Sequence, residues 1–192
     1  YAPEPSLDQL REGFSLETYR WVVWGRPRPV EAEPVPEALT LADGTTLRAL
    51  PAPGHADDMV CYLAEGHGLL FSADLYITPR PQYLRFDENA PRLIESIHGV
   101  LEHDFDTLLC AHRGVVENGR RALSEKGKYM EALCGVVQRR YRYDKVAVPE
   151  IADEILGCEG LLYWASGGDF SKQNLIASCL DDVPDEAGQV ME

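Results

Sequence analysis

The segment MVCYLAEGHGLLFSAD, residues 59–74, indicates how this chain folds. Two short apolar runs, residues 59–64 and 69–72, flank the turn-forming sequence Glu65-Gly66-His67-Gly68. Short apolar runs joined by a glycine-containing turn are typical of a β-hairpin. Ala73 and then Asp74 follow the second run, so the sequence predicts a carboxylate just past the end of a buried strand.

Further strands and helices are predicted on both sides of this hairpin. Before it, residues 38–41 and 45–48 flank Asp43-Gly44, which is a strong hairpin signal. After it, a helix is predicted for residues 89–101 and a short buried strand for residues 105–110. The remaining predicted elements are helices at residues 119–142, 149–156 and 170–180. This order predicts an α/β fold in which helices cover a sheet.

The predicted elements form one domain, residues 1–180, with three regions. Residues 1–36 are predicted to hold a helix followed by an extended, proline-rich crossing segment. Residues 37–118 hold the predicted sheet, and residues 119–180 form a helical C-terminal region. Residues 181–192 are acidic and have no core pattern, so a loose tail is expected there.

Composition restricts the partners that this chain can have. The 192 residues carry a formal net charge of −14, which disfavours binding to nucleic-acid phosphates. The five cysteines are odd in number and widely spaced, and none forms a Cys-x-x-Cys pair, which favours reduced thiols in the cytoplasm. No apolar run reaches the length of a membrane span. We expect a cytoplasmic protein with a small-molecule substrate, and a homo-oligomer is left open.

Three side chains are candidate metal ligands because each follows a predicted strand. His55 lies in a stiff turn after the first hairpin, Asp74 follows the strand at 69–72, and His112 follows the strand at 105–110. Residues at such positions are held rigidly and face a cleft. Imidazole and carboxylate groups bind zinc, and also iron or manganese. Taken singly, each residue has a simpler interpretation. A single histidine in a loop is usually solvated, and a single aspartate after a strand usually caps a helix or forms a turn.

Two further groups near these residues have two interpretations each. Asp57 and Asp58 either orient His55 or solvate the loop that contains it. Arg80 and Arg85, in a proline-containing loop after Asp74, either shape a pocket for an anionic substrate or only pack that loop.

The flanking sequences, taken together, resemble the metallo-β-lactamase superfamily. Ala52-Pro53-Gly54-His55, Leu70-Phe71-Ser72-Ala73-Asp74 and Cys110-Ala111-His112-Arg113-Gly114 are similar to its third, fourth and fifth metal motifs. Their spacings, 74 − 55 = 19 and 112 − 74 = 38, also fit. The resemblance covers residues 40–180 approximately. It implies an αββα sandwich, a site for two zinc ions, and hydrolysis of an ester, thioester, lactone or amide by metal-bound water.

Two departures from the family pattern limit this resemblance. Ala73 stands where the family has glycine, which is tolerable if its φ is negative. The leading His-x-His-x-Asp-His motif is absent, and with it the aspartate that orients the attacking water. The chain thus resembles mainly the second half of the sandwich and, by itself, is expected to be inactive.

Three interpretations follow from the missing motif. In the first, which we favour, the parent protein is a hydrolase and half of its site is missing from this chain. The second is a degenerate family member that acts as a scaffold or interaction module. The third is an iron-dependent redox member of the same superfamily.

Overall fold

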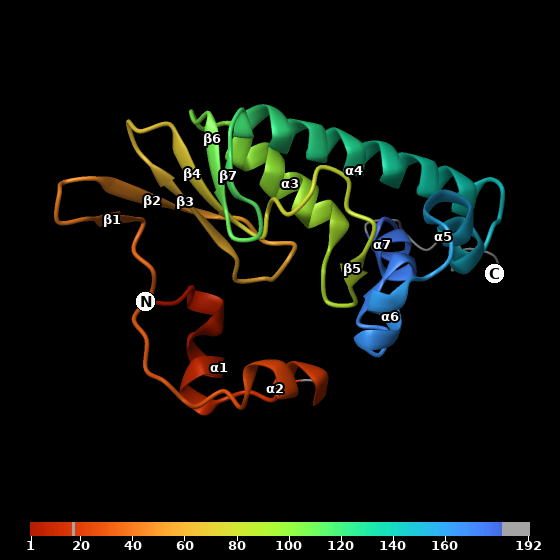
Figure 1. The fold of residues 1–192 in the computed structure, drawn as a ribbon, viewed down its shortest axis with the longest axis horizontal. Coiled ribbons are helices and arrows are strands. Elements are labelled where there is room, and N and C mark those ends of the chain that lie inside the picture. The colour runs from red at the N-terminus through yellow and green to blue at the C-terminus, as the bar shows by residue number, and fades with distance from the viewer. Residues whose placement is uncertain (17, 182–192) are drawn as a thin grey trace, which may run out of the picture.

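The computed structural model describes residues 1–16 and 18–181 (Figure 1). Along the chain, the elements are η1 (Glu4–Ser6), α1 (Leu7–Glu12), α2 (Thr18–Trp24), β1 (Ala38–Thr40), β2 (Thr46–Pro51), β3 (Val60–Ala64), β4 (Leu69–Ala73), β5 (Leu84–Arg85), α3 (Ala90–Leu101), β6 (Thr107–Cys110), β7 (Gly114–Val116), α4 (Gly119–Arg142), α5 (Val148–Leu156), α6 (Leu161–Ala165), β8 (Phe170–Ser171) and α7 (Lys172–Ser178).

Six strands form one sheet in the order β1-β2-β3-β4-β6-β7. The two predicted hairpins are confirmed, because β1 pairs with β2 and β3 pairs with β4 in antiparallel registers. The pair β4 and β6 is parallel, and α3 makes the crossover between them. The sequence did not predict β7, nor the small two-stranded sheet of β5 and β8.

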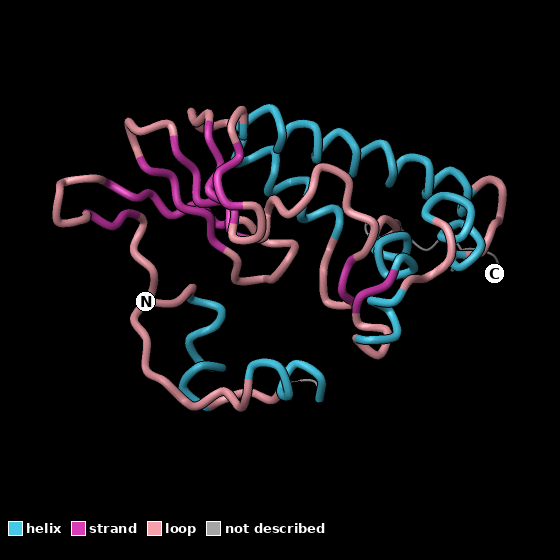
Figure 2. The backbone as a smooth tube through the Cα atoms, in the orientation of Figure 1, coloured by secondary structure: helices cyan, strands magenta, loops and turns pink. Residues whose placement is uncertain are grey.

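The core lies between the sheet and two helices on one of its faces (Figure 2). Alternate strand residues such as Cys61, Leu70 and Leu108 have no exposed surface. They pack in one cluster with Ile97 of α3 and Met130 of α4, which are equally buried. The apolar residues that recur every second position in the strands therefore pack against those that recur every 3.6 positions in the helices.

The other face of the sheet is open and apolar. Phe71 of β4 and Val115 of β7 are 41% and 67% exposed. A groove of about 450 Å³ runs along this face, and it is lined by Val60, Tyr62, Phe71, Ala73, Leu109, Cys110, Ala111, Gly114 and Val115. The α/β class is confirmed, and the described residues provide one sheet of the predicted sandwich with its helices.

The N-terminal segment lies beside the sheet (Figure 1). Residues 25–37 contain neither a helix nor a strand longer than one bridge, as predicted for an extended proline-rich segment. The segment closes on itself through a backbone hydrogen bond of 2.8 Å from Val30 N to Leu10 O. The Ser6 hydroxyl attaches the segment to the domain by donating to Asp58.

The C-terminal helices pack around β5 and β8. Helix α4 has the predicted bounds, whereas the predicted helix at 170–180 is in fact β8 followed by the shorter α7. Helix α6 was not predicted. Of the predicted acidic tail, residues 182–192 lie outside the described residues. The Asp181 carboxylate accepts a hydrogen bond of 2.7 Å from the Ser178 hydroxyl.

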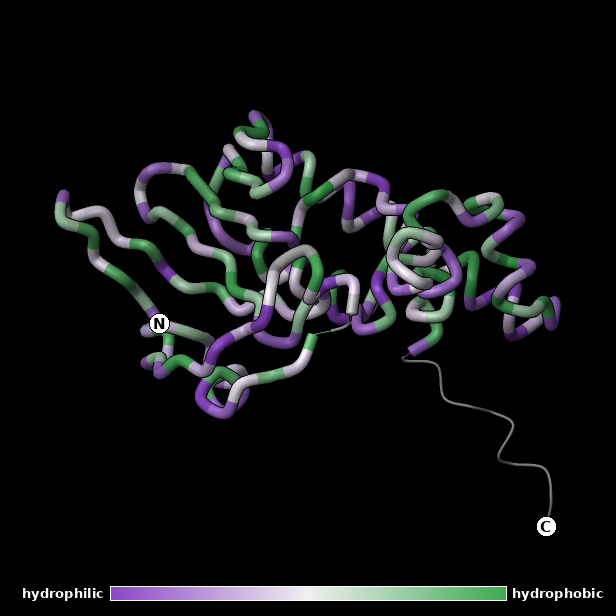
Figure 3. The backbone as a smooth tube through the Cα atoms, turned by 60° about the horizontal axis from the view of Figure 1, so that its bottom comes forward, coloured by the Kyte–Doolittle hydropathy of each residue, from purple (hydrophilic) through white to green (hydrophobic). Residues whose placement is uncertain are grey.

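Hydrophobic and hydrophilic residues are mixed along the helices (Figure 3). None of the described helices combines the length and the apolar character needed to cross a membrane.

Ala73 has a backbone conformation that glycine adopts more easily than alanine. Its φ is +43°, in the left-handed region, at an irregularity in the pairing of β4 with β6. An L-residue there crowds its Cβ against the following carbonyl, which glycine avoids. The condition under which alanine is tolerable here, a negative φ, is therefore not met, because the irregularity at the end of β4 holds this backbone in the left-handed region.

We predict that Ala73→Gly stabilises the protein by about 0.5–1 kcal/mol. The relief of left-handed strain, about 1–2 kcal/mol, exceeds the entropy that glycine adds to the unfolded chain. Urea denaturation measures the change. The opposite substitution at Gly54 is the comparison. Gly54 has a φ of +128°, and a Cβ there would lie 2.5 Å from the Leu93 nitrogen, so Gly54→Ala is expected to destabilise. A loss of stability in Ala73→Gly would contradict the strain argument.

Candidate metal centre

His55 is positioned by a loop that docks on the first turn of α3. Gly54 approaches the backbone of Leu93 too closely for any side chain. Its carbonyl accepts a hydrogen bond of 2.8 Å from Asn89 N, and the Ser96 hydroxyl donates to Pro53 O at 2.6 Å. These contacts join the end of β2 to α3, and they turn His55 toward the ends of β4 and β6.

Asp74 and His112 follow the two strands of the parallel pair. Asp74 comes directly after β4, and His112 lies in the turn between β6 and β7. Ala73 is aligned with Cys110 in this pairing. Because parallel strands end at the same edge of a sheet, the residues that follow them emerge side by side.

The three predicted residues meet at the Asp74 carboxylate. One oxygen, Oδ2, lies 3.2 Å from Nε2 of His55, and the other, Oδ1, lies 2.9 Å from Nε2 of His112. Oδ1 is buried, and none of the described residues donates a hydrogen bond to it with acceptable geometry. The carboxylate therefore stands between two imidazoles and keeps one buried oxygen without a hydrogen bond.

Glu88 contacts the other nitrogen of His55. Its Oε2 lies 3.1 Å from Nδ1, and its side chain is only 7% exposed. The Ser178 hydroxyl, which donates to Asp181, anchors this segment by accepting from Ala90 N at 2.8 Å, and it lies 3.1 Å from Glu88 O. No motif in the sequence pointed to Glu88. Asp57 and Asp58, which the sequence placed nearest to His55, contact Arg92 and Ser6 instead.

Arg85 adds a cation to the site. Its Nη2 donates to His55 O at 2.7 Å, and its Nη1 lies 3.1 Å from Nε2 of the same residue. It also contacts the Asp87 carboxylate at 2.8 Å. Of the two arginines considered in the sequence, Arg85 is thus the one that reaches His55.

These contacts change the pKa values of His55 and Asp74. Burial by itself would lower the pKa of His55, but hydrogen bonds with Asp74 and Glu88 outweigh it and raise this pKa to about 9. The hydrogen bond with His55 lowers the pKa of Asp74 despite its partial burial. Without a metal, a protonated His55 therefore supplies positive charge between two carboxylates.

Lys126 of α4 holds the segment after Asp74 from the core side. It is 4% exposed, and its ammonium group donates to Leu75 O at 2.6 Å. Burial lowers the pKa of Lys126 to about 8. The buried cation near Asp74 and Glu88 partly balances their charge.

His55, Asp74 and His112 are suitable metal ligands, but they do not form one complete metal site. Imidazole and carboxylate groups are zinc donors, and an unsatisfied carboxylate oxygen can accept a cation. Among the described residues, no three His, Cys, Asp or Glu side chains surround a common position. The reason is that Asp74 lies between the histidines, so that each of its oxygens pairs with one imidazole.

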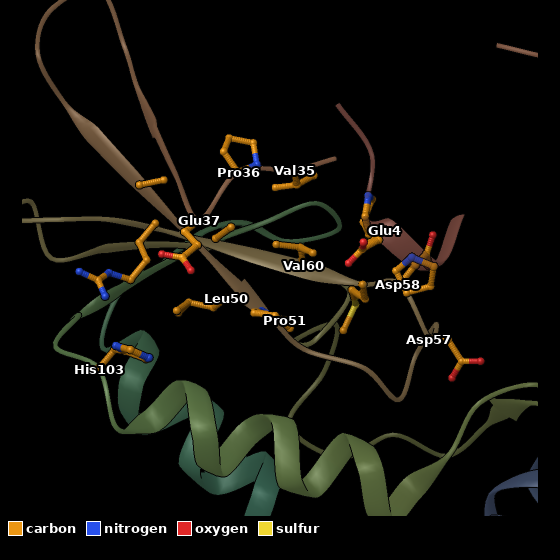
Figure 4. Close-up of a pocket in the computed structure, with 16 residues that line it drawn as sticks. Glu4, Val35, Pro36, Glu37, Leu50, Pro51, Asp57, Asp58, Val60 and His103 are labelled. Atoms are coloured by element: carbon orange, nitrogen blue, oxygen red, sulfur yellow. The ribbon is translucent and has the colours of Figure 1, made fainter. Parts of the chain in front are cut away.

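A second cavity lies away from these residues (Figure 4). It has a volume of about 680 Å³, and its lining comes from the N-terminal segment, β2, β3 and the loop after α3. Its polar side chains include Glu4, Glu37 and His103, but none of the three predicted ligands. The groove on the open sheet face is closer to the candidate ligands. Ala73 and Ala111 line it, and they are the sequence neighbours of Asp74 and His112.

Comparison with known proteins identifies the fold. No protein-family model and no curated protein matches the sequence. A metallo-beta-lactamase family protein from Thermus thermophilus matches the structure with a TM-score of 0.62 and 18% identity, over 90% of this chain and 56% of that chain. This chain has the metallo-β-lactamase fold. The fold resemblance inferred from the three motifs is therefore confirmed.

Two further solved structures are similar to this chain. A sec-alkylsulfatase from Pseudomonas sp. matches with a TM-score of 0.58 and 20% identity, over 85% of this chain and 28% of that chain. A beta-lactamase domain protein from Burkholderia ambifaria matches with a TM-score of 0.57 and 16% identity, over 80% and 47%. The chain thus spans about half, or less, of the length of these three proteins.

We predict that Lys126 makes the stability of the metal-free protein depend on pH. Its pKa is about 8 when folded, against an ordinary 10.5. Between pH 8 and 10.5 the unfolded chain binds more protons at this residue than the folded protein does. The free energy of unfolding therefore rises with pH across this range, by roughly 3 kcal/mol in total. Urea denaturation at the two ends of this range measures it. Lys126→Met should remove this contribution, and an equal pH dependence in both proteins would contradict the assignment.

Proposed function

We propose that this chain supplies one side of the active site of a metal-dependent hydrolase. The observation that carries the proposal is the Asp74 carboxylate, which faces Nε2 of His55 with one oxygen and Nε2 of His112 with the other. A carboxylate flanked in this way suits two ions that share it. We propose His55, Asp74 and His112 as ligands of a zinc pair, and iron or manganese would accept the same donors.

Residues around the ligands would prepare them for this role. Bound metal ions of this kind supply a Lewis acid and lower the pKa of a bound water. Glu88 accepts a hydrogen bond at Nδ1 of His55, which leaves Nε2 to face the metal and fixes the ring orientation. Arg85 and Lys126 keep positive charge near Asp74 and Glu88. These contacts support a site built to hold ionised carboxylates.

The three donors are too few for two ions, because zinc normally takes three or four ligands. We propose that the other donors come from residues outside this chain, in a layer that covers the open sheet face. Two observations support this. The apolar groove lies exposed beside Asp74 and His112, and the chain spans only 56% of the Thermus thermophilus protein.

The substrate we propose is a small ester, thioester, lactone or amide. The net charge of −14 disfavours a polyanionic substrate such as nucleic acid. The three ligand motifs resemble those of a superfamily whose members hydrolyse such acyl groups, and this resemblance supports the choice.

Metal content is the first test. We expect about two metal ions per chain, by elemental analysis, in the protein as its gene encodes it. His55→Ala and His112→Ala should each reduce this content. His98→Ala is the matched control, because His98 pairs with Glu131 outside the candidate site.

Two results would contradict the proposal. If the protein binds no metal even after reconstitution, the three motifs have no catalytic role, and a scaffold becomes the better interpretation. If His98→Ala lowers the metal content as much as His55→Ala, the ligand assignment is wrong.

Glu88 gives a second test. Glu88→Gln weakens the carboxylate contact to Nδ1 of His55, and we expect metal affinity to fall about 10–100-fold. Competition with a chromogenic chelator measures the affinity. Asp58→Asn is the control, because Asp58 contacts Ser6 instead of His55. Unchanged affinity in Glu88→Gln would exclude a role for Glu88 in orienting His55.

A further inference from the structure

Two cysteines from distant parts of the sequence meet in the core. Cys134 lies on α4, and Cys179 is the residue that follows α7, 45 positions later. Their sulfur atoms are 2.7 Å apart. Cys134 is 6% exposed and Cys179 has no exposed surface. The spacing of the five cysteines predicts reduced thiols, because nothing in it indicates this contact.

The surrounding backbone holds the two residues together. One helical turn after Cys134, the Gln138 amide donates to Cys179 O at 3.0 Å. On the other side, Cys179 N donates to Leu175 O at 3.3 Å, so the residue continues the last turn of α7. Both thiols belong to the same apolar cluster as Leu175. The contact therefore joins two helices at a fixed point.

The other three cysteines differ from this pair. Cys61 donates to Ser72 O at 3.4 Å, and Cys110 donates to Tyr76 O at 2.7 Å. Each of these buried thiols contacts a backbone carbonyl, whereas Cys158 is exposed. Only the pair on α4 and α7 brings two sulfurs into contact among the described residues.

We propose that Cys134 and Cys179 form a disulfide by exchange with a low-molecular-weight disulfide such as oxidised glutathione. The Cys134 thiolate attacks one glutathione sulfur, and a glutathione thiolate leaves. The Cys179 thiol then loses its proton and attacks the Cys134 sulfur of the mixed disulfide, which releases the second glutathione. Two protein thiols are oxidised, and one glutathione disulfide is reduced to two thiols.

The electrostatics of the pair support this order of attack. The hydrogen bond between the two sulfurs lowers the pKa of the Cys134 thiol. The same hydrogen bond, together with burial, raises the pKa of Cys179. The thiolate is the nucleophile in exchange, and Cys134 is 6% exposed whereas Cys179 has no exposed surface, so Cys134 is the sulfur that reacts first.

The cross-link would fix the helix end that supports the candidate site. Ser178 precedes Cys179, and its hydroxyl contacts the backbone of Glu88 and Ala90. Glu88 in turn contacts His55. A covalent tie at Cys179 therefore restrains the segment that orients Glu88. The bond itself does not depend on the proposed metal chemistry.

Refolding in a glutathione redox buffer tests the proposal directly. The background variant is Cys158→Ser, which removes the exposed thiol and leaves four cysteines. Protein refolded from the reduced, unfolded state is quenched with acid, unfolded and titrated for free thiols. We expect two free thiols, and a non-reducing tryptic digest that links peptide 129–139 to peptide 173–192.

Thermal unfolding provides an independent readout. A disulfide that closes a loop of this length should raise the midpoint by about 5–10 °C relative to the reduced protein. Cys134→Ser and Cys179→Ser, each in the Cys158→Ser background, should show no difference between oxidising and reducing buffers. This comparison is made within each variant, so a general loss of stability does not affect it.

Two outcomes would overturn the proposal. One is four free thiols after refolding in the oxidising buffer, which would show that the pair stays reduced. The other is a disulfide that links different cysteines, such as Cys61 and Cys110. The metal content of the refolded protein, measured in parallel, distinguishes a failure of this cross-link from a failure of the hydrolase proposal.

Discussion

The parallel pairing of β4 with β6 determines the rest of the candidate site. Parallel strands need a crossover, and α3 provides it on the covered face of the sheet. The two strands then end at the same edge, which places Asp74 beside His112. The same crossover helix receives the loop after β2, because Gly54 lets that loop touch the backbone of Leu93. Three sequence-distant residues thus converge through one topological feature.

Charge balance follows from this convergence. Asp74 and the more deeply buried Glu88 flank His55, and an ionised carboxylate in such a place needs compensation. Arg85 and Lys126 provide positive charge from β5 and α4, while protonation of His55 provides more. This environment keeps the pKa of Asp74 low. A bound metal ion would supply positive charge that otherwise comes from protonated His55, Arg85 and Lys126.

The open sheet face and the incomplete donor set are features of the same region. Ala73 and Ala111 line the exposed groove, and their neighbours Asp74 and His112 belong to the candidate site. A large apolar surface next to polar ligands is characteristic of an interface. This is why we propose that the remaining ligands and the cover of this face belong to one additional layer of the fold.

Local sequence signals predicted the parts of this fold that depend on neighbouring residues. The two hairpins, α3 and α4 follow from turn residues and apolar periodicity, and the motifs around His55, Asp74 and His112 identified the fold. These signals work because each depends on residues a few positions apart. The helix predicted at 170–180 was partly wrong, since residues 170–171 pair with β5 instead.

Only the tertiary structure decided the contacts between distant segments. The role of Glu88 depends on Ser178, the Cys134 contact depends on the end of α7, and the φ of Ala73 depends on its register with β6. No local pattern encodes such pairs, because they arise when separately formed elements pack together. The sequence by itself determined the two hairpins, the strand β6 and the main helices, and it proposed the three candidate ligands. Packing decided which side chains surround them, because burial and hydrogen bonding depend on neighbours that lie far away along the chain.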